Sequence, residues 1–182
     1  MSRSTSIPSE QVHLEVVETE LGWVAIWGEG RVIQGIVFGQ RSDRAAMAAA
    51  HKKSATRLTR DRWHPELAER LVAYAAGVPD DFASIEIDLA HLTEFSARVV
   101  RQCRRIGYGQ TSSYGRLAAA AGSPGAARAV GTVMSGNRYP IIVPCHRVLN
   151  ANGSLGNYSG PEGMRMKARL LQLEQQPIGL AF

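Results

Sequence analysis

The chain has 182 residues, of which 45% are hydrophobic and 20% charged, with 21 Lys and Arg against 16 Asp and Glu. This balance excludes a mainly disordered chain, and no apolar run reaches the roughly 18–20 residues that a membrane span needs. Two cysteines, Cys103 and Cys145, are too few for a disulfide framework. Because residues 1–10 also lack the apolar segment of a secretory signal, we expect an intracellular protein with no membrane partner.

The first half of the chain predicts a small sheet and a helix. Alternating apolar residues predict three strands, at 12–16, 23–27 and 32–38, that form a meander. Gly28-Glu29-Gly30 supplies the turn between the second strand and the third. Alanines and spaced apolar residues predict one helix over 42–76, which Gly77-Val78-Pro79-Asp80 stops. The alternation at 82–89 predicts an edge strand or an extended linker.

The second half predicts short helices separated by turns. Thr93 caps the first, which runs to about residue 105 and buries Phe95, Val99, Val100 and Cys103, so we expect Cys103 to be inert. Ser113 caps a helix over 114–121, and a third spans about 125–135. These two, joined by a Gly/Pro turn, predict a helix-turn-helix, although an ordinary helix pair fits equally well.

Two further elements are predicted around the end of the chain. Residues 141–143 are expected to form a buried strand or extended run that leads into 144–147. The last helix is expected over about 161–175, with Pro161 and Glu162 in its first turn and Met166, Leu170, Leu171 and Leu173 facing inward.

Charge is unevenly distributed along the sequence. Residues 1–94 carry 10 basic and 14 acidic residues, whereas residues 95–182 carry 11 basic and 2 acidic ones. Between Phe95 and Pro161 there are eight arginines and no acid. This asymmetry indicates either a polyanion partner for the second half or a solvated arginine-rich face. It also favours two domains, at residues 1–90 and 91–182.

Pro144-Cys145-His146-Arg147 is the strongest chemical signal in the chain. The thiolate is the nucleophilic form of cysteine, and an unperturbed thiol is mostly protonated at neutral pH. His146 can accept the proton through a water or a turn, and Arg147 can favour the anion. A Cys–His pair taken alone is more often structural than catalytic.

Six segments together extend this motif to a family. They are Gly107-Tyr108-Gly109-Gln110-Thr111, Ser113-Tyr114-Gly115, Ala126 to Gly131, Pro144 to Val148, Gly156-Asn157-Tyr158-Ser159-Gly160, and Lys167 to Glu174. In this order and spacing the region from Phe95 to Glu174 resembles the O6-alkylguanine-DNA alkyltransferases, also called methylated-DNA–protein-cysteine methyltransferases. The resemblance implies an α/β (α+β) fold. In it, a small N-terminal antiparallel-sheet domain precedes a mainly helical, winged-helix-like domain with a helix-turn-helix.

The resemblance implies DNA repair without a cofactor. The alkyl group of O6-alkylguanine, and of O4-alkylthymine, would pass once and irreversibly to Cys145. The proton relay would run from Cys145 through water to His146 and Glu174, the general arrangement of an oriented base. Asn137 would brace the turn before Cys145. The protein would act as a cytoplasmic monomer, associated with the nucleoid in a bacterium.

The resemblance also assigns contacts to double-stranded DNA. The target base would be flipped out of the duplex, Arg128 would fill the gap, and Tyr114 would crowd the phosphate and then bind the guanine. Small residues would let the helix approach the minor groove. The further DNA-contacting residues would be Thr111, Ser113, Ala126, Ala127, Ala129 and Gly131. The base pocket would be formed by Tyr114, Arg147, Val148, Gly156, Asn157, Tyr158 and Ser159.

Three departures from the family pattern affect loops. Gly107 replaces a common proline, the segment 137–140 (Asn-Arg-Tyr-Pro) replaces a shorter Asn-Pro, and Pro161-Glu162 follows Gly160 where a second glycine is common. No zinc site is expected, because no cysteine precedes Cys103 and the histidines lack ligand spacing.

Three other functions compete with alkyl transfer. A non-catalytic alkyltransferase-like lesion binder would typically lack the cysteine that stands here at position 145. A regulator of the adaptive-response type would need a metal-binding cysteine cluster. A Cys-His hydrolase would leave the helix-turn-helix and the acid-free region unexplained.

Overall fold

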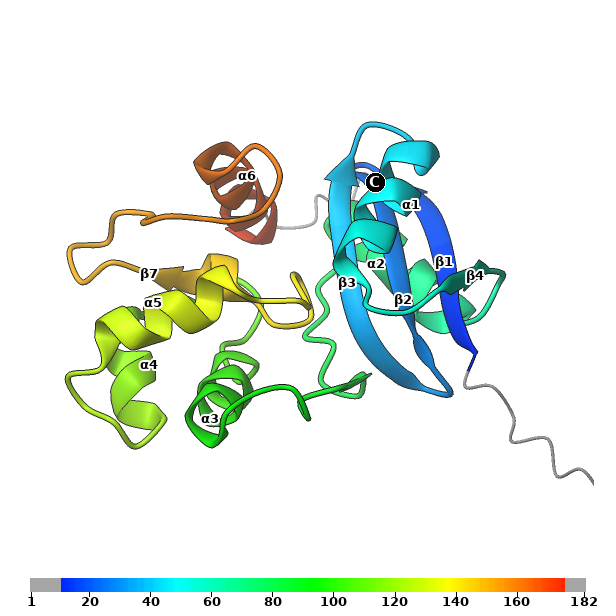
Figure 1. The fold of residues 1–182 in the computed structure, drawn as a ribbon. Coiled ribbons are helices and arrows are strands. Elements are labelled where there is room, and N and C mark those ends of the chain that lie inside the picture. The colour runs from blue at the N-terminus through cyan, green and yellow to red at the C-terminus, as the bar shows by residue number, and fades with distance from the viewer. Residues whose placement is uncertain (1–10, 176–182) are drawn as a thin grey trace, which may run out of the picture.

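The computed structural model describes residues 11–175 and places a five-stranded sheet beside a group of helices (Figure 1). The predicted antiparallel meander is confirmed: β1 (Val12–Thr19), β2 (Gly22–Glu29) and β3 (Val32–Gln40) pair in sequence order. Two short strands, β4 (Leu58–Arg60) and β5 (Glu86–Ile87), extend the edges in parallel, in the order β4-β1-β2-β3-β5. The sheet is therefore mixed, and only its centre is antiparallel.

Side-chain alternation gives this sheet two buried faces. Ala25, Trp27 and Val37 face helix α1 (Asp43–Lys53), which covers one side. Ile26 and Phe38 face the other way, into the core that helix α2 (Pro65–Ala75) shares with the C-terminal helices. Since both faces are covered, the strand sequences are largely apolar rather than strictly alternating. The sheet also joins the two halves of the molecule.

The prediction of a single helix over 42–76 is wrong. α1 ends at Lys53, β4 pairs with β1, and α2 begins at Pro65. Proline has no backbone N–H and is favoured in the first turn of a helix, so Pro65 marks a start rather than an interior position. Burial of Leu58 beside β1 fixes the intervening strand.

The helices of the second half follow the predicted caps. α3 (Glu94–Cys103) begins after Thr93, and α4 (Tyr114–Ala120) begins after Ser113; each cap side chain accepts a backbone N–H. α5 (Ala127–Ser135) follows the turn, so α4 and α5 form the helix-turn-helix (Figure 1). Beside it, β6 (Ser112–Ser113) pairs with β7 (Val148–Leu149).

Positive φ angles shorten one other prediction and correct two. Phe82 at +51° begins a turn in which the Ile85 amide donates to the Phe82 carbonyl, so the edge strand expected within 82–89 is limited to Glu86–Ile87. Ile141 at +76° prevents a strand over 141–143, although that run is fully buried. Glu162 at +57° keeps Pro161 and Glu162 out of the last helix, and α6 therefore spans Met164–Gln175. A side chain with a Cβ is strained in this region, so it interrupts regular structure.

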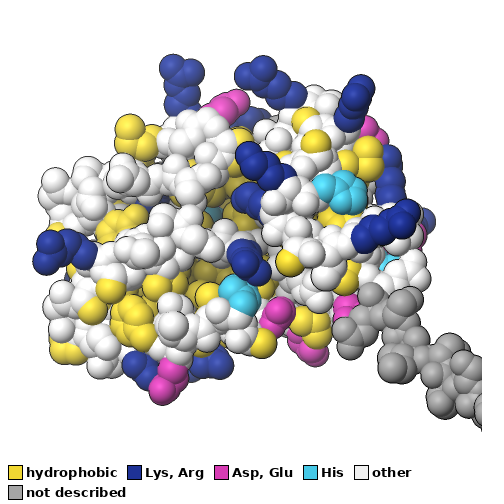
Figure 2. All heavy atoms as spheres, viewed as in Figure 1, with side chains coloured by type: hydrophobic (Ala, Val, Ile, Leu, Met, Phe, Trp, Pro, Cys, Tyr) yellow, Lys and Arg dark blue, Asp and Glu magenta, His cyan; other side chains and the backbone are white. Residues whose placement is uncertain are grey.

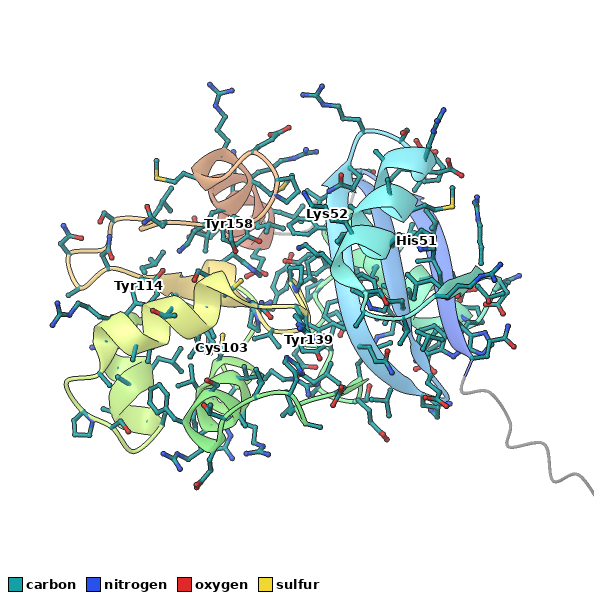
Figure 3. All side chains as sticks on the ribbon, viewed as in Figure 1. His51, Lys52, Cys103, Tyr114, Tyr139 and Tyr158 are labelled. Carbon is teal, nitrogen blue, oxygen red and sulfur yellow. The ribbon has the colours of Figure 1, made fainter. Side chains whose placement is uncertain are left out.

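The sheet and the C-terminal helices contact each other through polar groups as well as the core. The Ile36 amide donates to the Arg138 carbonyl over 2.9 Å. The Tyr139 hydroxyl, which lies between the two halves in Figure 3, donates to the Asp88 carbonyl. Among residues 11–175 no helix is long and apolar enough to cross a membrane. The domain division at residue 90 stays a prediction.

Candidate active site

Cys145 lies at the floor of a cavity of about 760 Å³ beside the helix-turn-helix. It begins a short 3₁₀ turn, Cys145–Arg147, and only 6% of the residue is exposed. The turn departs from a strand, so neighbouring side chains are not forced to opposite faces. A smaller cavity of about 200 Å³, lined by β3 and by residues 158–161, reaches Cys145 from the sheet side.

Asn137 fixes the loop that carries the thiol. Its Nδ2 donates to the Val143 carbonyl over 2.8 Å and to Cys145 Sγ over 3.2 Å, while its Oδ1 accepts from the Tyr139 amide over 2.9 Å. The side-chain amide of Asn137 thus fixes the loop at 137–140, where the sequence departs from the family pattern. Burial raises the pKa of the Cys145 thiol, against the hydrogen bond from Asn137 and the positive charge of Lys167. The resting group is a thiol, and a base must take its proton.

His146 and Glu174 lie behind Cys145, both buried. His146 Nε2 is 2.8 Å from Glu174 Oε1, whereas His146 Nδ1 has no hydrogen-bond partner among the residues that the structure describes. Burial lowers the pKa of His146, and Glu174 opposes that effect. The imidazole is therefore neutral near pH 7, with Nε2–H donated to the carboxylate and Nδ1 able to accept a proton.

Arg147 is an ion-pair partner of Glu174, and it does not line the cavity. Its Nη2 donates to Oε1 over 2.8 Å and its Nε to Oε2 over 2.9 Å, while Nη1 donates to the Ile106 carbonyl. Burial alone would raise the pKa of Glu174, but hydrogen bonds from His146, Arg147 and Tyr74 outweigh it and hold that pKa at about 2. The predicted place of Arg147 in the base pocket is not where the structure puts it.

Lys167 is a buried cation that the sequence analysis did not single out. Its Nζ donates to the Val148 carbonyl over 2.6 Å and lies 5.8 Å from the ring centre of Tyr114. Burial lowers the pKa of Lys167, and the neighbouring Cys145 opposes that effect. Val148 itself is fully buried and lines neither cavity, and its carbonyl accepts the hydrogen bond from Lys167. Its position in a matching segment was the only available signal.

The wall of the cavity facing α5 comes from a loop and the start of α4. Tyr114, Asn157, Tyr158 and Ser159 line it, as predicted residues of the pocket, and Figure 3 shows the two tyrosines on separate elements. Gly156 does not line the cavity. It has φ +67°, and a Cβ there would lie 3.2 Å from Asn150 Oδ1 and 3.4 Å from the Tyr114 ring, so glycine is favoured at this position by its backbone conformation and by the contact with Asn150.

The α5 side of the cavity is built from small residues and Arg128. Ala127, Arg128 and Gly131 line it, and a Cβ on Gly131 would meet no atom of the chain. Ala126 and Ala129 lie at the same end of α5 but do not line the cavity, and neither do Ser113 and Thr111, which precede α4. In the view of Figure 2, the surface over α4 and α5 is mostly uncharged, with Lys and Arg side chains at its margins.

The acid-free arginine region is only partly a free surface. Three of its eight arginines contact a carboxylate or backbone carbonyls of the chain itself: Arg98 with Glu94, Arg104 with the Phe82 and Ile85 carbonyls, and Arg147 with Glu174. The net charge of the second half therefore overstates what a polyanion could contact.

Two departures from the family pattern are compensated locally. After Gly107, a turn closes when the Gln110 amide donates to the Gly107 carbonyl, and the Gly109 amide donates to Glu174 Oε2 over 3.1 Å. Pro161 lies against Gly39 of β3, where a Cβ would approach it to 2.9 Å. Both loops are fixed by contacts with other elements.

Comparison with known proteins gives a consistent result. Residues 94–176 match the DNA-binding domain of 6-O-methylguanine DNA methyltransferase. The methylated-DNA–protein-cysteine methyltransferase of Mycobacterium tuberculosis is 36% identical over 170 residues, which cover 90% of this chain and 93% of that protein. The chain belongs to this methyltransferase family. The human member is 51% identical over 72 residues, covering 40% of this chain and 34% of that protein.

Solved structures of this methyltransferase family extend the match to the sheet. Mycobacterium tuberculosis OGT in complex with DNA has a TM-score of 0.74 at 35% identity, covering 89% of this chain and 92% of that one. The O6-methylguanine-DNA methyltransferase of Pyrococcus kodakaraensis has a TM-score of 0.70 at 27% identity, covering 91% and 100%. Within residues 11–175 no group of three or more His, Cys, Asp or Glu side chains could hold a metal ion.

Proposed function

We propose that the protein repairs DNA by moving the alkyl group of O6-alkylguanine, and of O4-alkylthymine, onto its own Cys145. One observation carries this proposal: the buried Cys145 thiol lines an open cavity, and the next residue, His146, is hydrogen-bonded to the buried carboxylate of Glu174. The cavity opens beside the helix-turn-helix, where a flipped base can enter.

The alkyl transfer needs no cofactor, because every bond and proton in it is supplied by the protein, the substrate and water. The Cys145 proton passes, through a water, to Nδ1 of His146, and the carboxylate of Glu174 stabilises the resulting imidazolium. The thiolate attacks the alkyl carbon, the S–C bond forms, and the C–O6 bond breaks with its electron pair left on guanine. Guanine then takes up one proton. The thioether has no leaving group that water displaces easily, so the protein turns over once.

Access to the base requires extrusion from the duplex, at a cost of a few kcal/mol. Arg128 is exposed at the rim of the cavity and would occupy the place of the flipped base. Packing within the chain does not require glycine at position 131, because a Cβ there would meet no neighbour. The absence of a side chain instead suits a close approach of α5 to the minor groove. Tyr114 and Ser159 would hydrogen-bond the guanine, and Tyr158 would contact its ring. We place this action in the cytoplasm, with the DNA.

Intact-protein mass spectrometry tests the proposal. After incubation with a duplex that contains O6-methylguanine, we expect a gain of one methyl group per protein, located on the Cys145 peptide. Cys145→Ser should keep duplex affinity and lose transfer, because binding rests on α4 and α5 rather than on the thiol. Binding without a mass gain in the wild type would favour the non-catalytic lesion binder, and a methyl group on Cys103 would refute the assignment of the acceptor.

A further inference from the structure

Tyr74 connects the sheet half of the molecule to the proton relay. It lies at the end of α2, and its hydroxyl donates to Glu174 Oε1 over 2.6 Å and lies 3.5 Å from His146 Nε2. The side chain is fully buried, with its ring edge-on to Phe82 and Tyr108 at 5.6 and 6.0 Å between centroids. Aromatic packing on two sides therefore fixes where the hydroxyl points.

Three side chains donate to one oxygen of Glu174. Oε1 receives the Tyr74 hydroxyl, His146 Nε2 and Arg147, the last through Nη2 at 2.8 Å and Nε at 3.2 Å. A carboxylate oxygen offers about two lone-pair directions, so each additional donor reduces the negative charge that the others experience. The Tyr74 hydroxyl thus competes directly with the imidazole for the same atom.

We propose that Tyr74 is a positioning residue of the alkyl transfer. Its hydroxyl fixes Glu174 Oε1 against His146 Nε2 and limits the negative charge facing the ring, so that His146 stays neutral with Nδ1 free for the Cys145 proton. This role rests on the proposed function. Tyr74 lies outside residues 94–176, the part that matches the DNA-binding domain, so the relay needs the sheet half for completion.

Charged and titratable groups reach His146 from several elements. Glu174 and Lys167 lie on α6, Arg147 and Cys145 on the turn of His146 itself, and Tyr74 on α2. Burial lowers the pKa of His146 most, Glu174 opposes this, and Arg147 and Lys167 add to it. Tyr108 contacts Tyr74 and Arg147 instead.

Loss of the Tyr74 hydroxyl should therefore change the pKa of His146 in one direction. The carboxylate charge would face the imidazole with one donor fewer, the imidazolium would be better stabilised, and the pKa of His146 would rise. Because the base acts only when neutral, the acidic limb of the rate profile would move to higher pH.

Tyr74→Phe, which keeps the ring, tests this in single-turnover transfer from an O6-methylguanine duplex between pH 4.5 and 8.5. We expect the acidic limb to lie about half a pH unit higher, which makes the rate about threefold lower at any pH on that limb, and a plateau within about twofold of wild type. Tyr108→Phe is the matched control, because its hydroxyl donates to the Gly77 and Leu173 carbonyls at 3.3 Å and leaves Glu174 untouched. Its acidic limb should coincide with that of the wild type.

Thermal unfolding of both variants reports lost packing separately. In the wild type, NMR should resolve a slowly exchanging Tyr74 hydroxyl proton with an Overhauser contact to the His146 ring; its absence would overturn the geometry even if Tyr74→Phe fails to fold. Identical acidic limbs in the wild type and Tyr74→Phe would overturn the role of Tyr74 alone. A wild type that transfers no methyl group would overturn the proposed function, and the role of Tyr74 with it.

Discussion

Glu174→Gln would remove one negative charge from the buried cluster while keeping the side-chain shape. Burial alone would raise the pKa of Glu174, but the hydrogen bonds from His146 and Arg147 lower it from 4.5 to about 2. That difference corresponds to about 3 kcal/mol of folding free energy at neutral pH. The value agrees with the roughly 3–5 kcal/mol lost when one partner of a buried ion pair is removed. Arg147, only 1% exposed, would be left without its counter-charge.

The pH dependence gives this prediction its sign. A carboxyl group whose pKa is lowered by folding stabilises the protein above its unfolded pKa, and that contribution is lost as pH falls through the folded pKa. The cost of Glu174→Gln should therefore be about 3 kcal/mol at pH 7, about 2 kcal/mol at pH 3.5, and absent below about pH 2. Protonated Glu and Gln are equivalent in charge, which is why the two proteins converge.

Urea unfolding of both proteins at several pH values measures this cost. Glu94→Gln is the control, since Glu94 pairs with Arg98 on the surface of α3 with its side chain 87% exposed. It should cost at most about 0.5 kcal/mol. A loss below about 1 kcal/mol for Glu174→Gln at pH 7, or a loss that does not shrink with acid, would refute the electrostatic reasoning.

Three other outcomes are expected. Arg128→Ala should slow transfer from duplex DNA by tenfold or more, since about 1.4 kcal/mol of uncompensated unstacking is a factor of ten. It should leave free O6-benzylguanine unaffected, whereas Arg101→Ala should only weaken duplex binding; equal losses on both substrates would exclude stack filling. Gly156→Ala should lower the rate with free O6-benzylguanine, because the new Cβ would press on Asn150, which lines the cavity, while Gly153→Ala, at φ +80° with open space around it, should not; equal rates in the two variants would count against this contact. Duplex binding should weaken with salt at a log–log slope between about −1 and −5, because about five arginines of the acid-free region remain available; a zero slope in a salt titration would contradict phosphate contacts.

Local sequence signals predicted the helices of the second half well. Thr93 and Ser113 cap their helices as expected, because a cap needs only a side-chain oxygen and an amide three residues later. The single helix over 42–76 failed for a different reason. β4 exists through its pairing with β1, a partner more than 40 residues away, and no local pattern encodes that contact.

The sequence by itself predicted the nucleophile, its neighbouring base and the helix-turn-helix, through the order and spacing of six segments that resemble one family. Only the tertiary structure decided which groups meet Glu174. Arg147 joins it from 27 residues away and Tyr74 from 100, and both are buried there. An arginine more often lies on the surface, and a tyrosine more often packs in an apolar core. The folded elements decide that Arg147 and Tyr74 meet Glu174 instead, because a buried charge is stable only where enough partners converge on it.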